Sequence, residues 1–151
     1  MSTLERSPLA PGSFPRIPAV DGVRMATRMA RIKYRGRRDV LLVECARGST
    51  VAGVLTRSTT AAAPVLWCRR QLVHGSIRGL VVNSGNANAF TGAAGISAVN
   101  DTAAAAAQAL GCQRNRVFVA STGVIGESLP VQLLIGAIPA MAQSLAPVSY
   151  T

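Results

Sequence analysis

The segment GLVVNSGNANAFTGAAGISAVNDTAAAAAQALG, residues 79–111, predicts a short strand, a polar loop and a long helix in succession. From Ala93 onward the apolar residues recur every three or four positions, which places them on one face of a helix. Thr91 is suited to the N-cap of this helix and Gly111 to its left-handed C-terminal stop. The expected apolar face comprises Ile96, Val99, Ala103, Ala106 and Leu110.

The next segment has the same order of elements. Residues 117–120 predict a strand, and after a polar loop Pro130 can occupy the first turn of a helix in which Pro139 is expected to cause a kink. Residues 128–151 carry no charge, so a membrane span is an alternative. Glutamine, proline and serine interrupt this stretch, and we therefore expect a buried amphipathic helix. Its expected face comprises Val131, Leu134, Ile135, Ile138, Met141, Ala142 and Leu145.

Upstream, shorter patterns predict further strands. The apolar run 40–43 is typical of a strand covered on both faces, and residues 51–56 are expected to return beside it as a hairpin. Alternation in residues 31–35 predicts a half-buried strand with a charged outer face. Trp67 is expected to anchor a short helix or loop over residues 61–70. Hairpin and crossover connections together predict an α/β fold with a mixed sheet and packed helices.

The composition fits one domain. The four prolines of residues 1–20 predict an extended tail, and residues 21–151 are left for the α/β domain. Among the 151 residues, 16 are basic and 6 acidic, a formal net charge of +10. One interpretation is a surface for nucleic acid or another polyanion, with residues 24–38 as its basic stretch. We prefer a second interpretation, in which a partner or a later part of the protein balances the charge, because Tyr34 is the only aromatic residue within that stretch.

The three cysteines, Cys45, Cys68 and Cys112, do not form a CxxC pair, and His74 is the only histidine. This spacing does not predict a metal site, and we expect buried thiols in the reducing cytoplasm. Cys68 and His74 could form a thiol–imidazole pair, but nothing else in the sequence favours it. We find no signal peptide, because the tail lacks an apolar run; a transit peptide is an alternative, and a cytoplasmic protein is the simpler expectation.

The two polar loops carry the candidate chemistry. Residues 83–92 are rich in side-chain amides, which either line a site or serve as turn and capping groups. In residues 121–127 a threonine hydroxyl stands beside a glycine N–H, and two adjacent donors suit an oxyanion hole. The alternative is a glycine turn into the last helix. The loop lacks the lysine of a phosphate-binding loop.

Taken together, these loops resemble the ornithine acetyltransferase family. The resemblance includes SPLAP at residues 7–11, VDGV at 20–23 and VAGVLTRS at 51–58. It continues through APV at 63–65 and WCR at 67–69, and it runs from about Ser7 to about Leu145. Residues 83–92 and 121–130 are its most specific parts. It implies the N-terminal, alpha-chain part of that family's sandwich fold.

The resemblance also implies a mechanism. Members are made as a precursor that cuts itself before a threonine, and this threonine of the beta chain takes acetyl from N-acetylornithine and passes it to glutamate. Some members also accept acetyl-CoA, no cofactor is needed, and the assembly is two alpha with two beta chains. The oxyanion hole falls on the Thr122 hydroxyl and the Gly123 N–H. We assign the shaping of the site to Asn83, Ser84, Gly85, Asn86 and Asn88.

The sequence departs from the family at its end. The family's substrate-binding threonine and lysine, its cleavage site and its nucleophile have no matching positions here, and residues 148–151 do not resemble the approach to the cleavage site. We therefore expect an incomplete alpha chain that has no acetyl-transfer activity alone. The alternatives are a non-catalytic remnant that pairs with or binds a partner, and a basic polyanion-binding domain; we do not expect a membrane or nucleic acid as the partner.

Overall fold

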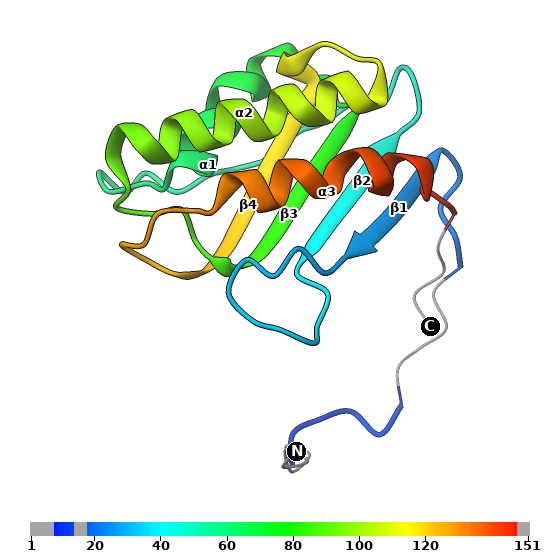
Figure 1. Cartoon of the computed structure of the whole chain (residues 1–151). Coiled ribbons are helices and arrows are strands. Elements are labelled where there is room, and N and C mark those ends of the chain that lie inside the picture. Colours follow the sequence, from blue (N-terminus) through cyan, green and yellow to red (C-terminus); the bar gives the residue numbers. More distant parts are fainter. Residues whose placement is uncertain (1–7, 14–17, 148–151) are drawn as a thin grey trace.

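A mixed four-stranded sheet organises the chain in the computed structural model, which describes residues 8–13 and 18–147. The strands are β1 (Val23–Arg28), β2 (Val40–Cys45), β3 (Gly79–Asn86) and β4 (Val117–Val124), and they lie in the order β1-β2-β3-β4. β2 is antiparallel to β1 and to β3, whereas β3 and β4 are parallel (Figure 1). The mixed α/β sheet predicted from the sequence is confirmed.

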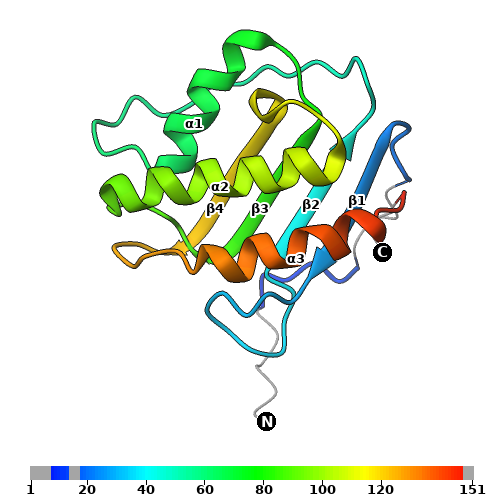
Figure 2. The same ribbon diagram turned by 45° about the horizontal axis from the view of Figure 1, so that its top comes forward.

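Two long helices cover one face of this sheet. α2 (Gly92–Leu110) packs against β3 and β4, and α3 (Val131–Gln143) lies beside α2 and packs against β1 and β2 (Figures 1 and 2). α2 connects the parallel pair β3 and β4, because parallel strands need a crossover connection. The fully buried side chains between sheet and helices include Leu42, Val81, Val117, Leu134, Ile138 and Met141.

The third helix protects an edge of the sheet. α1 (Ala63–Gln71) begins with Pro64 in its first turn and continues into the 3-10 turn Leu72–His74. The Trp67 indole N–H donates to the carbonyl of Val117 at 2.8 Å, and the Cys68 thiol donates to that of Val119 at 3.2 Å. α1 therefore shields β4, the edge strand, from pairing with another chain. The expected anchoring role of Trp67, which is 8% exposed, is confirmed.

The two long helices follow the predicted pattern with two differences. Gly111 has φ +60° and ends α2 in the left-handed conformation, and Leu134, Ile138 and Met141 of α3 are buried, as expected. Thr91 stands at the N-cap of α2, but its hydroxyl donates to the amide oxygen of Asn88 instead of capping the helix. Ile96 is 40% exposed, because the buried stripe of α2 is centred on small residues that allow close packing: Gly95, Ala98, Val99, Thr102, Ala103, Ala106 and Ala107.

The strand predicted over residues 31–35 is wrong. The edge strand is β1, and residues 29–39 form the loop that connects it to β2. Asp39 is 4% exposed, and its carboxylate accepts hydrogen bonds from the backbone N–H groups of Ala30 (2.6 Å) and Ile32 (2.7 Å). These bonds hold the loop closed, so Ile32 is buried as a loop residue while Tyr34 is 46% exposed.

Replacing Asp39 with alanine should therefore loosen this loop. Two backbone N–H groups would lose a charged acceptor, which is expected to lower the free energy of unfolding by about 2 kcal/mol. Urea unfolding of the purified variant measures the loss. Asp101→Ala, an exposed carboxylate on α2, is the matched control, and equal losses in the two variants would contradict this role.

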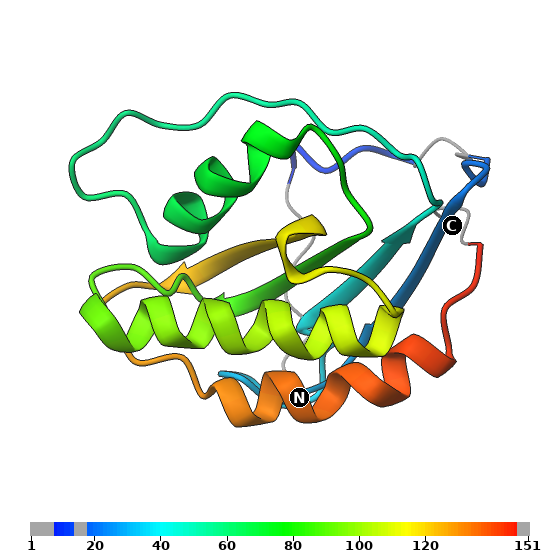
Figure 3. The same ribbon diagram turned by 90° about the horizontal axis from the view of Figure 1, so that it is seen from above.

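The hairpin predicted from residues 51–56 is also wrong, because β2 pairs with β1 and β3 instead. Residues 51–60 are neither helix nor strand, and the start of this segment is held by the bridge of Thr50 with Ser76 and by the bond from the Val51 N–H to the Gly75 carbonyl at 3.0 Å. In Figure 3 the segment runs along the side of the strands opposite α2 and α3. Val54 is 98% exposed. An apolar, extended segment thus lies without a partner strand among the described residues.

The sheet face opposite α2 and α3 carries apolar residues that are only partly covered. Phe118 and Val43 are buried there but lie outside the main core cluster, whereas Ala120 is exposed. The half-buried apolar side chains of this face include Met25, Leu41, Leu80 and Val82, which alternate with the core residues along their strands. We call this surface the open face.

Two further expectations concern the ends of the chain. Residues 8–13 and 18–20 contain neither helix nor strand, whereas residues 1–7 and 14–17 of the expected tail and residues 148–151 lie outside the described part. Within the ranges that the structure describes, no helix is long and apolar enough to cross a membrane. The uncharged stretch after residue 128 instead forms α3 against the sheet.

Candidate functional site

The fold brings the two polar loops together. β3 and β4 are parallel, so their carboxyl ends lie at the same edge of the sheet, which is where open α/β sheets commonly bind ligands. In the register of this pair, Asn83 lies opposite Ser121, Ser84 opposite Thr122 and Gly85 opposite Gly123. The Ser121 hydroxyl donates to the amide oxygen of Asn83 at 2.6 Å, which joins the loops directly.

Thr122 and Gly123 are both exposed at this edge. Thr122 alternates with Phe118 and Ala120 along β4 and so belongs to the open face. Gly123 has φ +133° and lies so close to β3 that a Cβ there would be 2.3 Å from the carbonyl carbon of Gly85. The close approach of the two strands therefore requires glycine at position 123.

The three asparagines of the first polar loop are buried next to Thr122 and Gly123. Asn83, Asn86 and Asn88 are 1%, 2% and 0% exposed. The Asn83 amide donates to the Asn86 carbonyl at 2.8 Å, that of Asn86 to the Glu127 carbonyl at 3.0 Å, and that of Asn88 to the Gly95 carbonyl at 3.0 Å. Asn88 has φ +47°, a conformation that asparagine tolerates better than most residues. Their amide groups hold loop backbone, which suits shaping of the site better than direct contact with a substrate.

The structure also contains an ion pair at this edge, between Lys33 and Glu127, that the sequence pattern did not indicate. Lys33 Nζ lies 2.8 Å and 2.6 Å from the two carboxylate oxygens of Glu127. A Cβ on Gly85 would lie 2.7 Å from Cβ of Lys33, so the loop carrying Lys33 packs directly on β3. The two charged residues are 94 positions apart, and no local spacing connects them. The pair links the 29–39 loop to the end of the Ser121–Glu127 loop.

The thiols and the histidine form no second reactive centre in the described structure. Burial raises the pKa of the Cys68 thiol, and the bond to Val119 that opposes this increase already occupies the thiol. Burial likewise raises the pKa of Cys45 and Cys112. His74 lies at the exposed end of the 3-10 turn after α1. Within the described ranges, no three His, Cys, Asp or Glu side chains are grouped as a metal ion would require.

The basic stretch 24–38 divides between β1 and the 29–39 loop. Arg24 pairs with Glu44, and Arg38 donates to the Thr27 hydroxyl at 2.6 Å. The guanidinium of Arg37 lies 4.1 Å from the centre of the Tyr34 ring. The one aromatic ring of the stretch is therefore already covered by a cation, which disfavours a base-stacking platform.

Comparison with known proteins gives a consistent result. The sequence model of the ArgJ family matches residues 24–150. The arginine biosynthesis bifunctional protein ArgJ of Bradyrhizobium diazoefficiens is 50% identical over 144 residues, which are 95% of this chain and 35% of that protein. The protein of the same name from Rhizobium meliloti is 54% identical over 138 residues, or 91% of this chain and 33% of that protein. The chain thus spans about a third of the length of these curated relatives.

Solved structures agree with the sequence match. Ornithine acetyltransferase from Mycobacterium tuberculosis, crystallised in complex with ornithine, superposes with a TM-score of 0.82 at 36% identity and covers 87% of this chain and 72% of that one. The arginine biosynthesis bifunctional protein of Bacillus halodurans superposes with a TM-score of 0.75 at 31% identity, over 81% of this chain and 65% of that one. At these identities both the fold and the family are shared.

Proposed function

Because the chain belongs to the ArgJ family, we propose that it supplies the oxyanion hole of an acetyltransferase of arginine biosynthesis. The acetyl group would pass from N-acetylornithine to glutamate through an acetyl-threonine whose hydroxyl comes from another part of the assembly. The observation that carries the proposal is the position of Thr122 and Gly123. Both are exposed at the carboxyl edge of a parallel strand pair, and the Thr122 side chain belongs to the open face of the sheet.

The chemistry requires fixed donors at that position. Transfer through an acetyl-threonine passes through two tetrahedral oxyanions, one as the ester forms and one as it breaks. A hydroxyl and an adjacent backbone N–H held on a rigid strand end can stabilise each oxyanion without reorganising. The bond from Ser121 to Asn83 and the bond from the Asn86 amide to the Glu127 carbonyl support such rigidity, because they hold the segments on both sides of Thr122 and Gly123. Acetyl-CoA is a second acetyl donor that this arrangement would admit.

The partner half would cover the open face. In this proposal residues 21–151 are one part of a larger α/β domain, and the remainder of the family's length packs on the apolar residues of that face. It would bring the nucleophilic threonine to the space in front of Thr122, and an acidic partner would offset the net charge of +10. The family's assembly of two alpha and two beta chains is the expected arrangement.

Co-production of this chain with the remaining two thirds of a close relative, which contains the rest of its alpha chain and its beta chain, tests the proposal. We expect the chain alone to bind a hydrophobic dye, to aggregate and to lack activity, because its open face is uncovered. The pair should co-purify, lose the dye signal and release ornithine from N-acetylornithine when glutamate is present. A chain that melts cooperatively as a monomer without binding dye, or a stable pair without ornithine release, would contradict it.

A further inference from the structure

Four arginines gather at the edge of the sheet opposite the candidate active site. Arg24 lies in β1, Arg47 follows β2, Arg78 precedes β3 and Arg116 precedes β4. Backbone hydrogen bonds hold the last elements in register, because the N–H of Arg78 donates to the Arg116 carbonyl at 2.8 Å and that of Cys45 to the Arg78 carbonyl at 3.0 Å. The sheet therefore fixes the backbone from which Arg78 and Arg116 extend.

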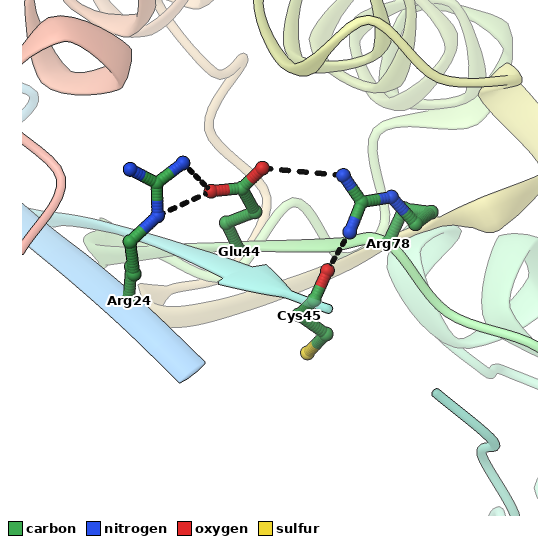
Figure 4. A network of polar contacts seen from close by, with 4 residues as sticks. All are labelled: Arg24, Glu44, Cys45 and Arg78. Carbon is green, nitrogen blue, oxygen red and sulfur yellow. Dashed lines mark hydrogen bonds and ion pairs between the residues drawn. The ribbon is translucent and has the colours of Figure 1, made fainter. Parts of the chain in front are cut away.

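The carboxylates at this edge do not neutralise the positive charge of the four arginines. Glu44 accepts a hydrogen bond from Arg24 Nε at 2.8 Å and one from Arg78 Nη2 at 3.2 Å, so one carboxylate serves two guanidinium groups (Figure 4). Arg78 also donates to the carbonyl of Cys45, and its side chain is only 11% exposed. Within the described ranges, Arg47 and Arg116 form no ion pair. Positive charge thus remains in excess around a largely buried arginine.

A cavity lies beside three of these arginines, Arg47, Arg78 and Arg116. Its volume is about 390 Å³, and it is lined by Arg47, Arg78, Gly111, Cys112, Gln113 and Arg116, without an acidic residue. An adjoining cavity of about 430 Å³ shares Arg47 and Arg78, but Asp21 and Glu44 also line it and make it less favourable for an anion. The C-terminus of α2 at Gly111 attracts cations, but with a partial charge of only about half an electron, which cannot offset three guanidinium groups.

We propose that the smaller cavity binds a small molecule through a phosphate group. A phosphate dianion matches the two arginines without ion pairs, and guanidinium groups bind phosphate oxygens in a two-pronged geometry that a lysine cannot offer. The volume has room for the phosphate and part of the molecule that carries it. The site lies at the opposite end of β3 and β4 from Thr122, so it would be a second site, independent of acetyl transfer.

Thermal unfolding of the purified assembly of this chain with the remaining two thirds of a close relative, at constant ionic strength, tests this site. Inorganic phosphate and AMP are titrated separately, and sodium chloride serves as the ionic-strength control. The two titrations distinguish binding of free phosphate from binding of a nucleotide. We expect a saturable rise in melting temperature with at least one of them. Arg47→Gln and Arg116→Gln should each weaken binding, measured by calorimetry, by about tenfold, since each removes a charged donor from the anion.

Arg35→Gln is the matched control, because Arg35 is exposed in the basic loop near the opposite edge. It should bind phosphate or AMP as the unmodified protein does. The proposal is overturned if the melting temperature follows ionic strength alone, or if Arg35→Gln weakens binding as much as Arg116→Gln. Circular dichroism of each variant checks that the fold is retained, which we expect because Arg47 and Arg116 are both exposed.

Discussion

Alanine at position 122 is expected to lower kcat of the assembled acetyltransferase by roughly 10²–10³-fold and to change KM little. The Thr122 hydroxyl is proposed to meet the substrate oxygen most strongly when that oxygen becomes negative, so its loss raises the barrier more than it weakens ground-state binding. Because Thr122 is exposed at the end of β4, truncating it removes almost no packing. Steady-state ornithine release under saturating N-acetylornithine measures the effect.

The conservative variant Thr122→Ser separates this role from a structural one. Serine keeps the hydroxyl and removes only a methyl group, so it should retain most of the turnover that alanine loses. Both variants should unfold at the urea concentration of the unmodified protein. Unchanged kcat in Thr122→Ala would remove the hydroxyl from the mechanism, and equal losses in the serine and alanine variants would point to packing instead.

The elements that position this hydroxyl could be predicted because local patterns determine them. The run at residues 79–82, the helical spacing after Ala93 and the stop at Gly111 each depend on neighbours in sequence, and the structure confirms β3, α2 and the left-handed turn between α2 and β4. Two successive strand–loop units joined by a helix then imply that both loops meet at one edge. The juxtaposition of Asn83 and Ser121 follows from that topology.

The errors fall where a distant residue decides the local conformation. Alternation in residues 31–35 predicted a strand, but the Asp39 carboxylate accepts hydrogen bonds from the N–H groups of Ala30 and Ile32 and closes this segment into a loop. Residues 51–56 have the composition of a strand, yet β3 takes the place beside β2 that a hairpin would have required. The Lys33–Glu127 pair was missed for the same reason, since it joins residues that only the folded sheet brings together.

Gly123→Ala is expected to be the most destabilising single-methyl change at this edge, at a cost of about 4 kcal/mol in the free energy of unfolding. The added Cβ would lie 2.3 Å from the carbonyl carbon of Gly85 and 2.5 Å from the backbone nitrogen of Asn86. Both are backbone atoms, so no side-chain rotation relieves the overlap. The φ of +133° adds strain for any residue with a Cβ. β3 and β4 must separate where they carry the two loops.

Gly126→Ala is the comparison that isolates the clash. Gly126 has φ +77°, but no heavy atom lies within 4 Å of the position that an added Cβ would take, so alanine there should cost only about 1–2 kcal/mol of conformational strain. The free energies of unfolding of the two variants, measured with urea, should differ by this margin. Equal losses of free energy would show that β3 and β4 move apart easily enough to accommodate the added methyl group. Alanine at 123 keeps the backbone N–H that the oxyanion needs. A stable but inactive Gly123→Ala enzyme would therefore show that the direction of this N–H, set by the close approach to Gly85, governs turnover.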